Sequence, residues 1–199
     1  MEFPADSEGL IRKGSNSTED DAIQTKAQNI WVSASHCHFN RDFQFNAEST
    51  AIQFTNHLTI GGRAWPGIIL NTINSEKALT LWGNSTIGIL LHWWHSNKQQ
   101  AGRGSIGISA LKSLPVLDVT KLTEKELTKA ANIFDDLKHK ELKPVNEMCD
   151  DVTRHEIDER LYGEVLGFPK EIISSDGPLA LLRQKLALEP SINGGKQTH

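Results

Sequence analysis

The stretch "GNSTIGILLHWWHSNKQQAGRGSIGISALKSLPV", residues 83–116, joins a very apolar segment to an unusual polar loop. Asn84 or Ser85 can cap a helix whose apolar run continues to about His95. The loop "SNKQQAGRG" ends that helix, "SIGIS" (105–109) is typical of a strand, and Pro115 stops the turn that follows. We therefore expect an apolar helix that supports a polar, glycine-containing loop.

The residues before this stretch favour strands. "NIWVSASHCHF" (29–39) alternates, and "STAIQFTNHLTI" (49–60) is rich in β-branched and aromatic residues before it stops at two glycines. "AWPGIILNTI" (64–73) predicts a further short strand, with its proline at the start or at an edge. A short helix capped by Ser75 then runs to about Trp82.

The residues after this stretch favour helices. Thr123 and Glu126 form a Thr-x-x-Glu capping box in front of an amphipathic segment at 123–140. Apolar residues recur at helical spacing in 151–168, and "GPLALLRQKLAL" (177–188) predicts a final helix. We predict an α+β fold with a flexible lead-in at 1–29, a β-rich unit at 30–118, a helical unit at 119–190 and a loose tail at 191–199.

Charge is distributed unevenly along a chain whose formal net charge is −4. Residues 56–117 carry five basic groups against one acidic group, whereas residues 118–199 carry twelve against sixteen. Two cysteines do not make a disulfide framework, and we see no signal peptide, so we expect a cytoplasmic protein. The longest apolar run is too short for a membrane span, and we expect no membrane association.

The polar loop lies inside the basic segment. Glutamine amides suit adenine edges, arginine suits guanine edges or phosphates, and glycines allow a ligand close to the backbone. The alternative is a plain solvated connection. As candidate DNA-binding residues we take four from the loop and two nearby cations: Lys98, Gln99, Gln100, Arg103, Arg63 and Lys112.

Three other features have an ordinary interpretation beside a functional one. His36 and His38 would share one face of a strand and could bind a metal with a ligand from "CDDVTRHE" (149–156), but they are also ordinary strand or loop histidines. Trp93 and Trp94 are typical of a core or an interface, and both cannot face the same way on a helix. The pairs Asp135–Asp136 and Asp150–Asp151 fit helix surfaces or caps better than acid/base catalysis.

Common catalytic motifs are missing from the sequence. We find no phosphate-binding Gly-x-x-x-x-Gly-Lys-Ser/Thr loop, no Gly-x-Ser-x-Gly nucleophile turn and no paired Cys-x-x-Cys zinc spacing. We therefore predict no catalytic residues, no bound metal and no cofactor, and expect that the chain is not an enzyme by itself.

Residues 75–166 resemble the target-recognition domains of restriction–modification systems. Such domains occur in type I specificity subunits and in the C-terminal part of adenine-specific DNA methyltransferases. The resemblance rests on Leu79, Asn84, Ser85, Trp93, Trp94, Gly102, Arg103, Gly104, Leu111, Leu114, Pro115 and Val116. The helix from Thr123 is similar to the spacer helix of such proteins, and "RHEIDERLYGEVLGF" (154–168) to their closing helix. The methyltransferases' Asn/Asp-Pro-Pro-aromatic and glycine-rich cofactor motifs do not occur here.

The resemblance implies a DNA-recognition module without the catalytic half. We expect double-stranded DNA as its ligand and a methyltransferase or nuclease subunit as its partner. A protein-interaction module that docks on a separate catalytic subunit is the alternative. A metal-dependent hydrolase that uses His36 and His38 is the third hypothesis.

Overall fold

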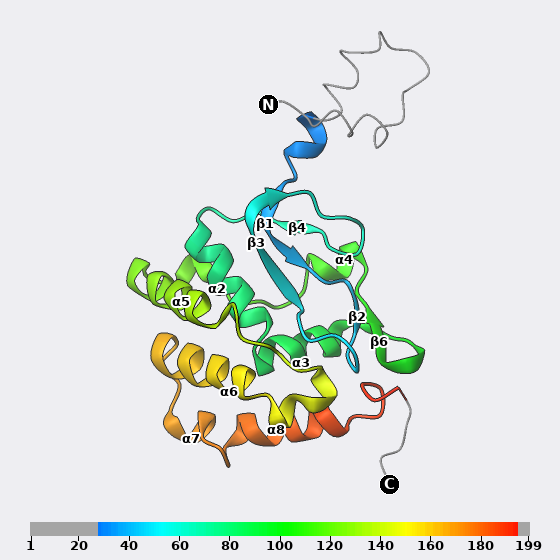
Figure 1. Cartoon of the computed structure of the whole chain (residues 1–199), viewed down its shortest axis with the longest axis vertical. Helices are drawn as coiled ribbons and strands as arrows, with labels where there is room; N and C mark the ends of the chain where they lie inside the picture. The colour runs from blue at the N-terminus through cyan, green and yellow to red at the C-terminus, as the bar shows by residue number, and fades with distance from the viewer. Residues whose placement is uncertain (1–27, 195–199) are drawn as a thin grey trace.

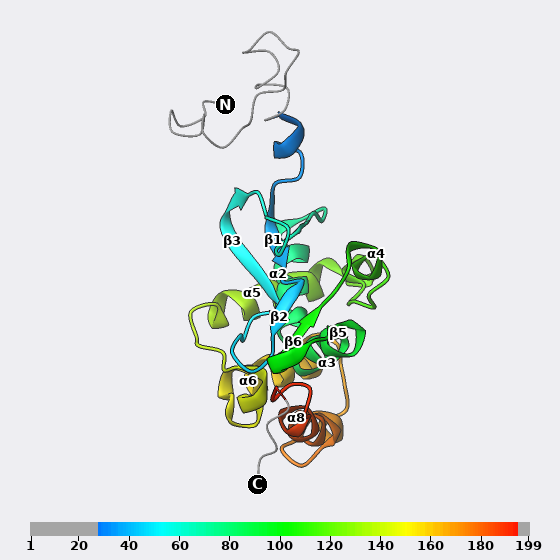
Figure 2. The same cartoon turned by 90° about the vertical axis from the view of Figure 1, so that its right-hand side faces the viewer.

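The protein combines helices with two small antiparallel sheets, so the predicted α+β class is confirmed. A computed structural model describes residues 28–194 (Figure 1). One sheet has the order β3 (Ile52–Thr59), β1 (Ser35–Phe39), β4 (Gly67–Ile68). The other has the order β2 (Asp42–Gln44), β6 (Arg103–Ser105), β5 (Asn97–Lys98). The β5–β6 hairpin projects on the right of Figure 1 and faces the viewer in Figure 2.

The helices pack around the sheets, mostly on the side away from the hairpin and below it (Figure 1). The α-helices are α2 (Ile73–Gly83), α3 (Thr86–His95), α4 (Ile108–Leu111), α5 (Glu124–Leu137), α6 (Val152–Asp158), α7 (Lys170–Ile173) and α8 (Pro178–Leu188). Short 3-10 segments occupy Val119–Lys121 and Val145–Asp150, Gln100–Gly102 forms a tight turn, and α6 continues as a π-helix over Glu159–Val165.

Helix starts follow the local capping signals closely. Ser85 caps α3 and accepts a hydrogen bond from the Gly88 amide, as one of the two predicted caps. The predicted capping box of Thr123 and Glu126 begins α5. The cap of α2 was predicted wrongly at Ser75, because the Thr72 side chain accepts from the Ser75 amide and begins the helix earlier.

One apolar core joins the two halves of the chain. Its largest cluster combines Cys37 and Phe39 of β1 with Trp82 of α2, Ile133 of α5 and Leu179 of α8. The expected boundary near residue 118 is therefore not a boundary of the core, since the strands have one face to bury and the later helices cover it.

The strands are shorter than the sequence predicted. Residues 28–31 form a helical turn, so the first strand begins only at Ser35. The segments 64–73 and 105–109 contribute only Gly67–Ile68 and Ser105 to strands, because Ile73 starts α2 and Ile108 starts α4. The 49–60 prediction agrees with β3. Alternation alone does not show where a pairing partner ends.

The chain ends were predicted as loose segments. Ile192 was placed in the loose tail, but it is fully buried beside Phe43 and Phe45, so residues 191–194 belong to the fold. Most of the expected lead-in (1–27), and the end of the tail (195–199), lie outside the described residues.

Within residues 28–194, no helix combines the length and apolar character needed to cross a membrane.

Candidate nucleic-acid interface

Four of the six candidate DNA-binding residues belong to one β-hairpin. β5 pairs with β6, and the Gln99 amide donates to the Arg103 carbonyl at 2.7 Å. Between them, Ala101 (φ 61°, ψ 33°) and Gly102 (φ 76°) adopt the left-handed pair of conformations that a type I′ turn requires. The turn leaves the side chains of Gln99, Gln100 and Arg103 exposed.

Two glycines let the base of the hairpin approach the core. A Cβ on Gly104 would lie 2.5 Å from Ser96 Oγ and 2.7 Å from a ring carbon of Phe45. A Cβ on Gly102 would lie 2.4 Å from the carbonyl oxygen of Ile192. Side chains at these positions would push the hairpin away from α3 and from the C-terminal segment, so the glycines fix its place.

His92 of α3 is buried among the aromatic residues next to the hairpin, of which Phe43 pairs with Gly104 of β6. Its ring is 1% exposed and stacks on Phe39 with centroids 4.9 Å apart, with Phe43 and Phe45 also in contact. Nε2 donates to the Asn40 carbonyl at 2.7 Å, and Nδ1 has no hydrogen-bond partner among the residues that the structure describes. Burial lowers the pKa of His92 to about 4, so the ring is neutral at pH 7.

The side chains of Trp93 and Trp94 face different ways, as expected. The Trp93 indole nitrogen donates to Ser191 Oγ at 2.9 Å, which joins α3 to the C-terminal segment. The Trp94 side chain points elsewhere and is 67% exposed.

Lys98 has a structural role in this conformation. Its ammonium group donates to the carbonyls of Trp93, Trp94 and Ser96, which are acceptors at the C-terminal end of α3. The same nitrogen lies 4.5 Å from the Trp93 ring centroid. Partial burial lowers the pKa of Lys98, and Glu189 opposes that shift. The other three hairpin residues are better placed to meet a ligand.

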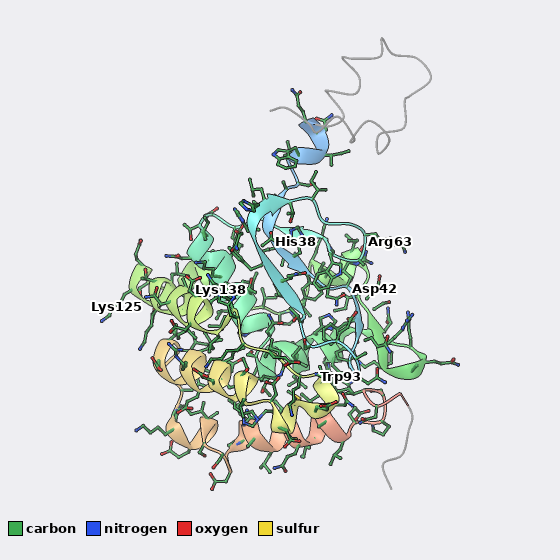
Figure 3. The ribbon with its side chains drawn as sticks, viewed as in Figure 1. His38, Asp42, Arg63, Trp93, Lys125 and Lys138 are labelled. Atoms are coloured by element: carbon green, nitrogen blue, oxygen red, sulfur yellow. The ribbon has the colours of Figure 1, made fainter. Side chains whose placement is uncertain are left out.

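Arg63 lies on the same side of the molecule as the hairpin. Its loop is held there by Arg41, a buried residue that the sequence did not single out. Arg41 Nε donates to the Ile106 carbonyl at 2.7 Å, and Arg41 Nη1 donates to the Arg63 carbonyl at 3.1 Å. The loop that carries Arg63 is therefore fastened to the chain that leaves β6. Figure 3 shows Arg63 on the right of the molecule, above Asp42. Lys112 is exposed directly after α4.

The charge of this face is moderately positive. Within residues 28–194, the side chains of Arg63, Arg103 and Lys112 form no ion pair. Asp42 places one exposed carboxylate on the same side, with Ser105 of β6 as its strand partner. Cations without a carboxylate partner are available for contact with a polyanion.

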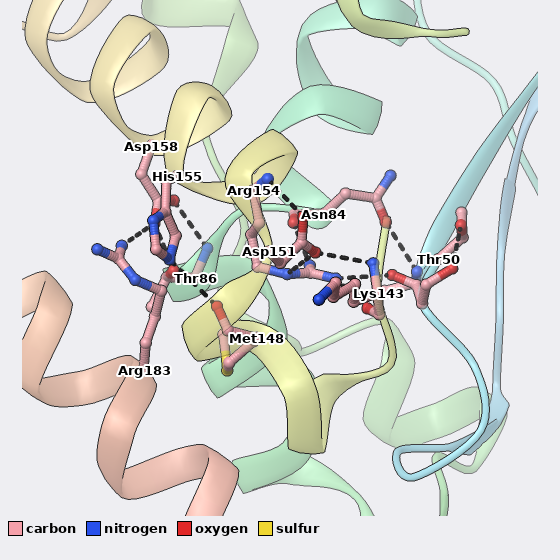
Figure 4. A network of polar contacts seen from close by, with 12 residues as sticks. Thr50, Asn84, Thr86, Lys143, Met148, Asp151, Arg154, His155, Asp158 and Arg183 are labelled. Atoms are coloured by element: carbon pink, nitrogen blue, oxygen red, sulfur yellow. Dashed lines mark hydrogen bonds and ion pairs between the residues drawn. The ribbon is translucent and has the colours of Figure 1, made fainter. Parts of the chain in front are cut away.

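A buried polar network holds α3 against the C-terminal helices (Figure 4). The Thr86 amide and hydroxyl both donate to the Asp158 carboxylate, the amide at 2.9 Å, and Arg183 donates to it at 2.7 Å. Burial raises the pKa of Asp158, while the Thr86 hydrogen bonds and the charge of Arg183 oppose the shift. Ser85 Oγ lies 2.6 Å from the Tyr162 hydroxyl.

Asn84 joins α2 to the beginning of β3. Its side-chain oxygen accepts from the amides of Ala51 and Ile52, and its side-chain nitrogen donates to the Ile52 carbonyl at 2.7 Å. Arg154, fully buried, donates to the Asn84 carbonyl. The Asn-Ser-Thr segment at 84–86 thus makes structural contacts with residues far away in the chain.

No pattern in the sequence identifies these buried contacts. Arg41, Asp158, Arg183 and Arg154 are charged residues, which are usually exposed, and their partners lie tens of residues away. Only the polar start of α3 gave a signal, and it was interpreted as a helix cap.

The two histidines of β1 have partners within their own sheet. His36 Nδ1 lies 2.8 Å from the Thr55 carbonyl, and His38 Nε2 lies 2.7 Å from Thr59 Oγ1. Asp151 and His155, which were considered as further ligands, bond instead to Arg154 and to the Met148 carbonyl. No group of three or more His, Cys, Asp or Glu residues within 28–194 could hold a metal ion.

Comparison of the chain with protein-family models, with curated proteins and with solved structures finds no match.

Proposed function

We propose that the protein is a DNA-recognition module in which the β5–β6 hairpin contacts double-stranded DNA. The observation that carries this proposal is the exposure of Gln99, Gln100 and Arg103 on one rigidly based hairpin. A two-stranded ribbon fits the major groove, where amide and guanidinium groups can pair with base edges. Arg63 and Lys112 would contact phosphates beside it. The resemblance of residues 75–166 to target-recognition domains supports the same assignment.

The catalytic step would belong to a partner subunit, a methyltransferase or a nuclease. Among the described residues, buried charged side chains such as Asp158 and Arg154 bond to other segments of the fold and have a structural role. The module would therefore supply the choice of sequence, and the partner the chemistry.

Titration of labelled duplex DNA at two salt concentrations tests the proposal. Binding should weaken as salt rises, because phosphate contacts release counterions. Arg103→Ala should cost about 1–3 kcal/mol if Arg103 reads a base, with Lys125→Ala, an exposed cation of α5, as the control. The proposal fails if no duplex from a random-sequence pool binds at low salt, or if Arg103→Ala leaves affinity unchanged.

A protein-interaction module remains the second candidate because Trp94 is a large exposed aromatic side chain on α3. In that case Trp94→Ala would abolish capture of a catalytic partner, and Arg103→Ala would not. Light scattering after size exclusion, with each variant and the co-purified partner, separates the two functions.

A further inference from the structure

A groove with a volume of about 610 Å³ lies on the other side of β3 from the hairpin. One wall is β3 with the preceding loop 47–50, and the other is the end of α5 with residues 138–142. In Figure 3, Lys138 lies to the left of β3 and Arg63 to the right. The groove is lined by apolar side chains, namely Ile52, Phe54, Phe134, Leu137, Leu142 and Ile157, and by polar ones that include Thr80, Asn84 and Thr153. Its volume is within the range of ligand sites in proteins.

β3 is an edge strand, and it presents peptide groups to this groove. The Phe39 amide donates to the Pro66 carbonyl on the β4 side, so the Phe39–Ile52 pair is not hydrogen-bonded across β1 and β3. The backbone N–H and C=O of Ile52 therefore point away from β1. The side-chain amide of Asn84 bonds to both of them. Hydrogen-bonded and non-hydrogen-bonded pairs alternate along an antiparallel ladder. The backbone N–H and C=O of Phe54, which pairs with Cys37, therefore point to the same outer edge as those of Ile52.

The peptide groups of Phe54 are available for a partner. Outside the pairing of β1 with β3, no hydrogen bond within residues 28–194 reaches the Phe54 amide or carbonyl. Asn84 already acts at Ile52 as the peptide unit of a neighbouring strand would. An extended segment that continues from Asn84 along β3 would therefore find the next pair of groups unused.

Both walls of the groove are fixed by one buried side chain. Arg154 Nη2 donates to the Ser49 carbonyl and to the Lys143 carbonyl, each at 3.1 Å. Arg154 is fully buried, and Asp151 lies 3.2 Å from its Nε. Because the two walls are already fixed, little conformational entropy of the protein is lost when a ligand binds between them.

The rim of the groove favours negative charge. Lys138, His139 and Lys140 line it, and among residues 28–194 the two ammonium groups pair with part-exposed carboxylates, those of Asp135 and Glu156. Such pairs are weak and exchange readily. The carboxylate of Glu48 on the other wall accepts from the Asn40 side chain and the Gln44 amide and keeps its negative charge, so the attraction for an acidic segment lies on the wall of Lys138 and Lys140.

We propose that this β3 groove binds an extended segment of a partner protein, in which acidic residues alternate with apolar ones. The segment pairs with the free peptide groups of Phe54, its apolar side chains cover the floor, and its carboxylates meet Lys138 and Lys140. The site is separate from the hairpin and does not depend on DNA contact.

The test uses a fluorescein-labelled peptide of eight residues that alternates Glu with Val. We expect the anisotropy of the labelled peptide to rise to saturation as the full chain is added. The double change Lys138→Glu and Lys140→Glu should weaken binding at least about tenfold. Lys125→Glu with Lys185→Glu, exposed positions on α5 and α8, makes the same change of charge and should leave binding unchanged. Arg103→Ala should also leave it unchanged, which separates this site from the proposed DNA contact.

Two further measurements report on strand addition. Hydrogen exchange of the Phe54 amide should slow when the peptide is bound, and a peptide methylated on alternate backbone nitrogens should bind at least about tenfold more weakly. Equal binding of the methylated peptide, or of one with Lys in place of Glu, overturns the proposal. It is also overturned if duplex DNA or a second copy of the chain, and not the peptide, protects Phe54.

Discussion

Acidification should destabilise the protein through His92. The neutral ring is enclosed by Phe39, Phe43 and Phe45, and its pKa is lowered from 6.5 to about 4 because burial penalises the charged form. The unfolded chain binds this proton more readily than the folded chain. The contribution of His92 to stability is therefore fully present above pH 6.5 and is lost as the pH falls towards 4.

The size of this effect follows from the pKa difference. A shift from 6.5 to about 4 corresponds to roughly 3 kcal/mol, and about 2.5 kcal/mol of that should be lost between pH 7 and pH 4.5. Burial also raises the pKa of Asp158, so a change in stability of the wild-type protein with pH is not assigned to His92 alone. His92→Phe provides the control because it keeps an aromatic ring and removes the titration.

Urea unfolding followed by tryptophan fluorescence at pH 7, 5.5 and 4.5 measures the effect at constant ionic strength. His92→Phe should be less stable at pH 7, since the Asn40 carbonyl loses its donor, but it should lose about 2.5 kcal/mol less on acidification. Parallel pH curves for the two proteins would refute the reasoning. So would a His92 pKa near 6.5 in an NMR titration of its ring protons.

Two further changes test the buried network and the hairpin turn. Asp158→Asn should destabilise the fold by about 3–5 kcal/mol, because Arg183 is left as a buried cation without its carboxylate, whereas Asp136→Asn, which weakens an exposed pair with Arg160, should cost less than about 1 kcal/mol. Equal losses in urea unfolding would contradict a structural role for Asp158. Ala101→Asn should stabilise the protein by about 0.5–1 kcal/mol, since asparagine tolerates the left-handed conformation that alanine adopts there. Calorimetry should show a higher Tm, and a lower one would mean that the turn is not strained.

Local features of the fold followed from local sequence. Helix starts depend on residues within one turn, and a few neighbouring residues are enough to predict them. Examples are Ser85, Thr123 and the proline at the start of α8. The polar loop was correctly separated from the apolar helix before it. The exposure of Gln99 and Gln100 agrees with that interpretation, and DNA recognition stays a prediction.

The sequence by itself determined the longer helices, the caps Ser85 and Thr123, the α+β class and the polar loop, because these depend on residues close together in the chain. Only the tertiary structure decided that the two predicted units share one core and that Ile192 is buried. It also decided that the loop is a hairpin held over His92, and that Ser85 and Thr86 bond to residues more than seventy positions later. Contacts between distant segments depend on which surfaces are buried together, and periodicity carries no information about that choice.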